Sequence, residues 1–215
     1  MIKNIIYDMG NVLIHWDPQR LIARQGVSGD DAKRLLREVF CDQEWTGLDR
    51  GRLTEEEAIA AFRARLPERL HEVVPRLVYW WHDPLWPVAG MAELVGELKA
   101  LGLNIYLCSN ATSALHVYFP RIPGSEHFDG LLVSADHRLL KPGHEIFELL
   151  YRSFSLDPAE CFFIDDAPQN IDGAIVTGMS GTVFDGDFPR LRRALREAGV
   201  PVREDVEIPA AAAET

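Results

Sequence analysis

The stretch Ile5-Ile6-Tyr7-Asp8-Met9-Gly10-Asn11-Val12-Leu13 sets one carboxylate directly after a short apolar run. It predicts a strand that is buried on both faces, ends at Asp8 and continues into a tight turn at Gly10-Asn11. An unpaired carboxylate beside a hydrophobic core is costly, so its position needs an explanation. One explanation places Asp8 at the carboxyl end of a central parallel strand, where open α/β sheets bind ligands. The other explanation is that Asp8 only caps the turn. The motifs in the rest of the sequence distinguish between these two explanations.

The composition is that of a globular protein with an acidic surface. The chain has 215 residues, of which 47% are hydrophobic and 26% are charged, and its formal net charge is −11. Nucleic acids and anionic membranes are therefore disfavoured as partners, and an anionic substrate would need a local cationic cluster or a bound metal. The three cysteines show no metal-ligand spacing, and Cys108 and Cys161 lie in apolar runs, where they pack as small hydrophobic residues. No signal peptide or apolar run of membrane length is present, which predicts a cytoplasmic location.

The segment after the first predicted strand shows only helical patterns. Residues 18–83 have helical periodicity, and Thr54 with Glu57 forms a capping box at the start of one helix. Within this segment, the stretch 44–51 is predicted to be a loop. The predicted parts are a small helical cap (residues 16–85), an α/β core (residues 1–15 and 86–208) and a disordered, alanine-rich tail (residues 209–215).

Strands and helices alternate through the remainder of the core. This alternation predicts right-handed crossovers and a parallel sheet that is covered by helices on both faces. The fold class is therefore α/β, a Rossmann-like core of three layers with a helical cap inserted after the first strand. The predicted strands are 103–108, 128–133, 161–164 and 181–184, and the predicted helices are 89–100, 146–151, 171–176 and 189–198.

Polar side chains follow four of the predicted apolar elements, at positions that a core would not select. Because the carboxyl ends of parallel strands lie along one edge of a sheet, these side chains can converge on one site. Two adjacent carboxylates facing a third repel one another unless a cation lies among them. Hard oxygen ligands suit Mg²⁺, which is held by one or two carboxylates together with substrate phosphate. The residues concerned are Asp8, Ser109-Asn110, Lys141 and Asp165-Asp166.

Taken together, these motifs resemble those of the haloacid dehalogenase-like hydrolase superfamily, and the resemblance spans nearly the whole chain. The helical segment occupies the position at which that superfamily inserts its subclass I cap. Within the superfamily, the chain looks most like the bacterial glucose-1-phosphate phosphatase group. This similarity lies in the turn at Gly10-Asn11-Val12 and in the segment from Phe163 to Ile171. That group is akin to the phosphatase domain of soluble epoxide hydrolase. The four matching motifs are Asp8 with its turn, Ser109-Asn110, Lys141-Pro142, and Asp165-Asp166 followed by Asn170 and Gly173.

The resemblance implies a Mg²⁺-dependent phosphatase that works through an aspartyl-phosphate. Asp8 would attack phosphorus, and water would then hydrolyse the intermediate. Mg²⁺ would be held by Asp8, the backbone carbonyl of Gly10 and Asp166, with Asp165 contributing directly or through those ligands. The expected partner is a small phosphorylated metabolite, with sugar phosphates favoured.

The same resemblance implies a phosphate-binding set. Ser109 and the backbone N–H of Asn110 would donate hydrogen bonds to the phosphoryl oxygens. Lys141 would stabilise both Asp8 and the charge on the transferring group. The sequence does not indicate an oligomeric state.

Gly10 departs from the pattern of most phosphatases of this superfamily, which place a second aspartate two residues after the nucleophile as acid and base. Loss of such a group removes roughly 10²–10⁴-fold of rate. The glucose-1-phosphate phosphatase group shows the same turn, which favours activity, and Asn11, His15 or a cap residue could replace the missing acid. Two alternatives stay open: a haloacid dehalogenase, which lacks paired carboxylates at the fourth motif, and a phosphate-binding regulatory protein with low turnover.

The cap offers candidates for substrate selection. Trp rings stack on sugars and Arg binds a second anion, although tryptophans in a small cap more often form its core. Four histidines elsewhere are scattered without metal spacing and are expected on the solvent side. The cap candidates are Trp45, Arg50, Trp80, Trp81 and His82, and the scattered histidines are His116, His127, His137 and His144.

Overall fold

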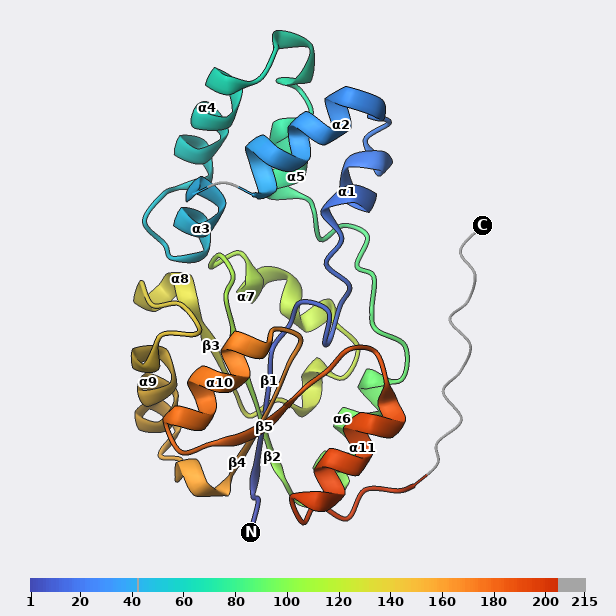
Figure 1. Cartoon of the computed structure of the whole chain (residues 1–215), viewed down its shortest axis with the longest axis vertical. Helices are drawn as coiled ribbons and strands as arrows, with labels where there is room; N and C mark the ends of the chain where they lie inside the picture. Colours follow the sequence, from blue (N-terminus) through green and yellow to red (C-terminus); the bar gives the residue numbers. More distant parts are fainter. Residues whose placement is uncertain (42, 205–215) are drawn as a thin grey trace.

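A five-stranded parallel sheet organises the molecule, as the alternation of elements predicts. The structure is a computed structural model that describes residues 1–41 and 43–204 (Figure 1). The strand order is β3-β2-β1-β4-β5, so the first strand of the chain is the central one. The strands are β1 (Asn4–Tyr7), β2 (Asn104–Ser109), β3 (Gly130–Val133), β4 (Cys161–Asp165) and β5 (Ser180–Val183).

Alternate side chains of the strands enter two separate hydrophobic clusters, one on each face of the sheet. In β1, Ile5 and Tyr7 enter one cluster, whereas Ile6 enters the other. All four β1 residues are buried, which explains why the strand reads as a continuous apolar run rather than an alternating one. Asp8 directly follows β1, so the carboxylate is held at the edge of the sheet by the register of the strand.

Helices cover both faces of the sheet, which gives the three layers that the sequence predicts. Figure 1 shows α9 and α10 on one side of the sheet and α6 and α11 on the other. The cysteines in apolar runs, Cys108 and Cys161, are both buried in the cluster beneath α9 and α10. The helices of this part are α6 (Met91–Ala100), α7 (Leu115–Tyr118), α8 (Ser134–His137), α9 (His144–Phe154), α10 (Pro168–Val176) and α11 (Phe188–Glu197), with 3₁₀ turns η3 (Phe119–Arg121), η4 (Ser125–His127) and η5 (Pro158–Glu160).

In the described part of the segment between β1 and α6, the named elements are all helical, and they have a hydrophobic cluster of their own. Asp17 caps the first helix by accepting hydrogen bonds from the backbone N–H groups of Gln19 and Arg20. The predicted capping box of Thr54 and Glu57 is present at the start of α4. The elements are α1 (Pro18–Arg24), α2 (Gly29–Leu35), the π-helical turn η1 (Leu36–Phe40), α3 (Gln43–Asp49), α4 (Glu55–Arg65), the 3₁₀ turn η2 (Glu68–Leu70) and α5 (Val74–Tyr79).

The prediction of a loop over residues 44–51 is wrong, because residues 43–49 form helix α3. Gly47 weakens the helical pattern in the sequence, but the structure uses it for close packing: a Cβ atom there would lie 2.8 Å from Cδ1 of Leu53. Leu48 is buried in the cluster of the helical segment and holds the helix in place. The predicted disordered tail, residues 209–215, lies outside the described residues. No described helix is both long enough and apolar enough to cross a membrane.

Candidate active site

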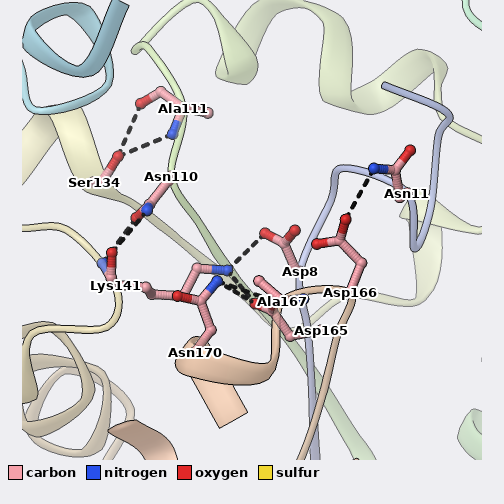
Figure 2. Close-up of polar contacts among 10 residues, drawn as sticks. All are labelled: Asp8, Asn11, Asn110, Ala111, Ser134, Lys141, Asp165, Asp166, Ala167 and Asn170. Carbon is pink, nitrogen blue, oxygen red and sulfur yellow. Dashed lines mark hydrogen bonds and ion pairs between the residues drawn. The ribbon is translucent and has the colours of Figure 1, made fainter. Parts of the chain in front are cut away.

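The predicted polar side chains converge at the carboxyl edge of the sheet, with Lys141 between two carboxylates. The ammonium Nζ of Lys141 lies 2.7 Å from Oδ1 of Asp8 and 2.7 Å from Oδ2 of Asp165 (Figure 2). The side chains of Lys141 and Asp165 are 1% and 0% exposed. This ion triplet is therefore shielded from bulk water, and its charges interact strongly.

Asp165 and Asp166 are neighbours with different surroundings. Asp165 accepts hydrogen bonds from the Asn170 amide at 2.9 and 3.1 Å and from the backbone N–H of Ala167 at 2.8 Å, besides its ion pair with Lys141. Its carboxylate is thus surrounded by donors from the start of α10. Asp166 is only half-buried and lines a cavity together with Asp8. The two carboxylates are therefore suited to different tasks, Asp165 to fixing Lys141 and Asp166 to binding a ligand.

Asn11 connects the first motif to the fourth, a contact that the sequence did not indicate. Its Nδ2 donates to Oδ2 of Asp166 at 2.9 Å, and its Oδ1 accepts from the backbone N–H of Trp16 at 2.9 Å. The residue has a left-handed backbone, with φ of 54°, which asparagine tolerates better than most residues. Both ends of the Asn11 side chain are thereby engaged.

Burial and neighbouring charges shift the pKa values of these groups. Burial raises the pKa of Asp8 to about 6, against the opposing effect of Lys141. Burial also raises the pKa of Asp166. Burial alone would lower the pKa of Lys141, but the charges of Asp8 and Asp165 outweigh this effect and raise it. Lys141 is therefore held in its charged form by the carboxylates around it.

The acidic cluster fits a hard divalent cation. One oxygen each from Asp8, Asp165 and Asp166 can be chosen so that all three lie within 4.8 Å of one another. The donors are carboxylate oxygens, the ligand type that Mg²⁺ prefers. Burial is the main cause of the raised pKa values of Asp8 and Asp166, and the charge of Asp165 adds to it; a divalent cation would offset both effects. This combination of spacing and unfavourable negative charge is the observation that supports a metal site.

The second motif lies beside the third. The side chain of Asn110 donates to the backbone carbonyl of Lys141 at 3.0 Å and accepts from its backbone N–H at 2.9 Å. The amide side chain of Asn110 therefore positions the Lys141 loop, as Figure 2 shows. Ser109 is buried at the end of β2 and lines the cavity. The backbone, rather than the side chain, of Asn110 is left to meet a ligand.

Above these groups lies a cavity of about 260 Å³, which residues of the helical segment also line. Its floor is polar and its roof is mainly apolar and aromatic. The floor consists of Asp8, Met9, Gly10, Asn11, Ser109, Asn110, Ala111, Thr112, Lys141, Asp166 and Asn170, and the roof consists of Trp16, Phe40, Trp45, Leu48, Asp49, Val78 and Trp81.

Of the cap candidates, Trp45 and Trp81 line the cavity. Trp45 also packs against the hydrophobic cluster of the helical segment. It therefore contributes to the core of this segment and is also placed to contact a substrate. Trp80 is 57% exposed, and neither it nor Arg50 lines the cavity. His82 stacks on Tyr118 instead, with ring centroids 4.3 Å apart.

Two further expectations concern histidines. His15 does not reach the cavity, because its ring lies against Trp86 with a centroid distance of 4.2 Å. Of the four scattered histidines, three are exposed and His127 is half-buried.

Sequence reasoning missed the roof residues Trp16, Phe40 and Asp49. Asp49 lay within the stretch predicted to be a loop, and no periodic signal indicated that this stretch faces the core.

Comparisons with known proteins show the family to which the chain is related. The family model for haloacid dehalogenase-like hydrolases matches residues 2–178. The sesquiterpene phosphatase astK of Aspergillus oryzae is 27% identical over 180 residues, which cover 83% of this chain and 88% of that protein.

Solved structures agree in fold. The HAD family enzyme BT-2542 from Bacteroides thetaiotaomicron matches with a TM-score of 0.66 and 24% identity, over 89% of this chain and 98% of that one. The same enzyme has been solved in complex with magnesium and inorganic phosphate, with a TM-score of 0.63 and 23% identity, over 89% of this chain and 99% of that one. The L-2-haloacid dehalogenase of Xanthobacter autotrophicus, with chloropropionic acid covalently bound, matches with a TM-score of 0.64 and 18% identity, over 98% of this chain and 92% of that one.

Proposed function

This chain belongs to the haloacid dehalogenase-like hydrolase family, and on that premise we propose that it is a Mg²⁺-dependent phosphatase of small phosphate monoesters. The observation that carries the proposal is the cluster of Asp8, Asp165 and Asp166 beside a cavity that Asp8, Asp166 and Lys141 line. Three carboxylates and one lysine attract a phosphate only when a cation is added, which is the reason for including Mg²⁺. We further propose that residues 16–85 act as a cap over a core formed by residues 1–15 and 86–208.

In the proposed mechanism, the phosphoryl group lies between Asp8 and the roof of the cavity. The hydroxyl of Ser109, the backbone N–H of Asn110 and the Lys141 ammonium donate to its oxygens. Mg²⁺ held by Asp8, Asp166 and the Gly10 carbonyl would supply the positive charge that lets a carboxylate approach a phosphate. Asp165 acts as a positioning residue, because its donors and its ion pair hold Lys141 beside Asp8.

Asp8 performs the chemistry in two steps. An oxygen of Asp8 attacks phosphorus, the bond from phosphorus to the ester oxygen breaks, and an aspartyl-phosphate forms. A water molecule then attacks the same phosphorus from the side that the alcohol has left. The bond to Asp8 breaks, and inorganic phosphate departs.

The lining of the cavity favours a substrate whose organic part is apolar. The roof presents three tryptophans, a phenylalanine and two aliphatic side chains, with Asp49 as its polar exception. Each hydroxyl of a sugar would need a hydrogen-bond partner once buried, and this roof offers few. The relative named sesquiterpene phosphatase supports the same substrate class. Sugar phosphates, predicted from the sequence, stay the second candidate because tryptophan rings also stack on sugars.

Of the two alternatives from the sequence, the dehalogenase is the weaker. A dehalogenase would not need the acidic pair Asp165-Asp166, and the similarity to a dehalogenase structure at 18% identity concerns the fold alone. A phosphate-binding protein without turnover would keep the same cluster, so only an assay separates it from an enzyme.

The test is hydrolysis of p-nitrophenyl phosphate with Mg²⁺ and with EDTA. We expect turnover with Mg²⁺, loss of turnover with EDTA, and loss in the variant Asp8→Asn. Asp30→Asn, a change on the exposed surface of α2, is the matched control and keeps the wild-type rate. Absence of turnover with Mg²⁺ at any pH would favour the binding protein.

A second assay addresses the substrate class. Comparison of kcat/KM for farnesyl phosphate, benzyl phosphate and glucose 1-phosphate should favour the first two by at least about tenfold, because apolar surface is buried against the roof. A preference for glucose 1-phosphate would instead support the sugar-phosphate prediction.

A further inference from the structure

Asp49 brings a carboxylate from the helical segment into the cavity. It ends α3 and lines the cavity opposite the polar floor. No described residue donates a hydrogen bond or forms an ion pair with this carboxylate. The charged and titratable groups that influence it are Asp8 on the floor and Tyr118 of α7. The Asp49 carboxyl group thus borders the cavity and has no hydrogen-bond or ion-pair partner among the described residues.

The position of Asp49 is held by contacts to the core rather than left to a mobile loop. The hydroxyl of Ser134, at the start of α8, donates to the backbone carbonyl of Asp49 at 2.5 Å and accepts from the backbone N–H of Ala111 at 2.9 Å. Two residues later, Gly51 passes so close to Ala135 that a Cβ atom would lie 2.2 Å from its carbonyl oxygen. These contacts fasten the end of α3 to the rim of the catalytic floor.

The other cavity residues do not provide a free acid. Asp8, Asp166 and Lys141 belong to the phosphate and metal centre. The side chain of Asn11 is engaged at both ends, and His15 lies against Trp86 outside the cavity. Of the titratable groups among the described lining residues, Asp49 alone stands outside the centre.

We propose that Asp49 is the proton donor to the leaving oxygen and then the base for the attacking water, in place of the acid that Gly10 lacks. This inference rests on the proposed phosphatase function. In an in-line displacement, the leaving oxygen lies on the side of phosphorus opposite to the nucleophile. Asp8 approaches from the sheet, so the leaving oxygen faces the roof, where Asp49 stands.

The proton balance of both steps closes with Asp49 alone. In the first step, the electron pair of the breaking phosphorus–oxygen bond goes to the ester oxygen, which takes the proton of Asp49 and leaves as an alcohol. In the second step, water forms its bond to phosphorus and passes one proton to the Asp49 carboxylate. The electron pair of the breaking bond to Asp8 returns to Asp8, and Asp49 is again protonated.

The surroundings of Asp49 favour a protonated carboxyl group. Burial raises its pKa to about 8, and the negative charge of Asp8 adds to this effect. A general acid works best when its pKa lies near the operating pH.

The experiment compares the first turnover of Asp49→Asn on two substrates with Mg²⁺ present. With an alkyl phosphate, whose alkoxide is a poor leaving group, we expect formation of the phosphoenzyme to slow by about 10²–10⁴-fold. With p-nitrophenyl phosphate, we expect a first turnover within about tenfold of wild type. That first turnover should appear as a burst of p-nitrophenol before a slower steady state, because hydrolysis of the phosphoenzyme lacks its base.

Two further variants serve as controls. Asp49→Glu keeps the carboxyl group and should recover part of the alkyl phosphate rate. Asp30→Asn, the surface change described above, should behave as wild type on both substrates. Thermal melting of each variant checks that the fold is kept.

The inference is overturned if Asp49→Asn forms the phosphoenzyme from the alkyl phosphate at the wild-type rate, or if both substrates slow equally. Either result would leave the phosphatase function intact, provided that the wild-type protein turns over and Asp8→Asn does not. Inactivity of the wild-type protein would instead remove the function on which the inference rests.

Discussion

Lys141 shows how much of the site depends on one buried charge. It contacts Asp8 and Asp165 at 2.7 Å each, and its side chain is almost wholly buried. A buried ion pair gains little over an apolar replacement of both partners, but removal of one partner leaves an uncompensated charge. Lys141 therefore stabilises two buried carboxylates, and this contribution to folding is separate from its proposed role in binding phosphate.

The variant Lys141→Met should lose about 3–5 kcal/mol of unfolding free energy at pH 7, because Asp8 and Asp165 stay buried without a cation. The loss should shrink as the pH falls toward 4. Carboxylates deprived of their cation have folded-state pKa values above their unfolded values, so protonation favours the folded state. Urea titrations at several pH values measure both effects.

The matched control for this change is Lys99→Met, which removes a lysine from a partly exposed pair with Asp129 at 2.6 Å. It should cost no more than about 1 kcal/mol and show little pH dependence. Equal losses of unfolding free energy in both variants would contradict the expectation that removing a buried cation costs more than removing a partly exposed one.

The contact between the end of α3 and α8 determines the position of the roof residues of the cavity. The end of α3 is tied to Ser134, and Gly51 fits against the backbone of Ala135 with a positive φ of 62°. A side chain at position 51 has no room, since the neighbouring atom is a backbone carbonyl. The roof residues Trp45 and Asp49 lie on the same helix and would move with it.

Gly51→Ala should therefore lower kcat/KM by about 10²-fold, because a shift of about 1 Å in the roof misplaces the groups that meet the substrate. Phosphatase assays and thermal melting measure the effect. Gly26→Ala is the matched control: this glycine also has a positive φ, 74°, but nothing lies within 4 Å of the added Cβ. It should cost about 1–2 kcal/mol of stability and leave kcat/KM unchanged. Equal activity losses in the two variants would show that backbone strain, not docking, is responsible.

The elements themselves were largely predictable, and α3 shows why one was not. Strong apolar runs such as that of β1 and end signals such as the capping box of α4 are local, and the structure confirms them. Helix α3 is short, contains Gly47 and is stabilised by packing of Leu48 and Trp45 against other helices. Such stabilisation comes from distant parts of the chain, which local patterns do not encode.

The same distinction applies to the site. Asp8 and Asp165-Asp166 were predictable because topology brings the strand ends together. Lys141 lies in the loop between α8 and α9 and was predictable only from the motif around it. The side-chain contacts of Asn11 and Asn110 depend on turn geometry, and the presence of Asp49 in the cavity depends on which face of the cap meets the core. Neither is specified by a spacing in the sequence.

The whole molecule combines an α/β core, with a hydrophobic cluster on each face of its sheet, and a helical segment that has its own hydrophobic cluster. Their junction encloses acidic groups from both parts: Asp8 from the sheet and Asp49 from α3. Burial raises the pKa of both groups, so ionisation of these carboxyl groups disfavours the folded state. Stability without a metal should therefore depend on pH in a way that reports on this junction.

Asp49→Asn should stabilise the metal-free protein at alkaline pH. The folded-state pKa of Asp49, about 8, lies above the usual value of 3.8, so the wild-type protein loses stability as the pH rises from about 4 to about 8. The variant lacks this loss, whereas the contribution of Asp8 is present in both proteins and largely cancels in their difference. Thermal melting with EDTA should show equal melting temperatures near pH 4 and a gap that widens up to pH 8 and then levels off. Each kcal/mol of difference corresponds to about 2–4 °C for a chain of this size. Parallel melting curves across this range would mean that Asp49 is ionised in water rather than buried at the junction.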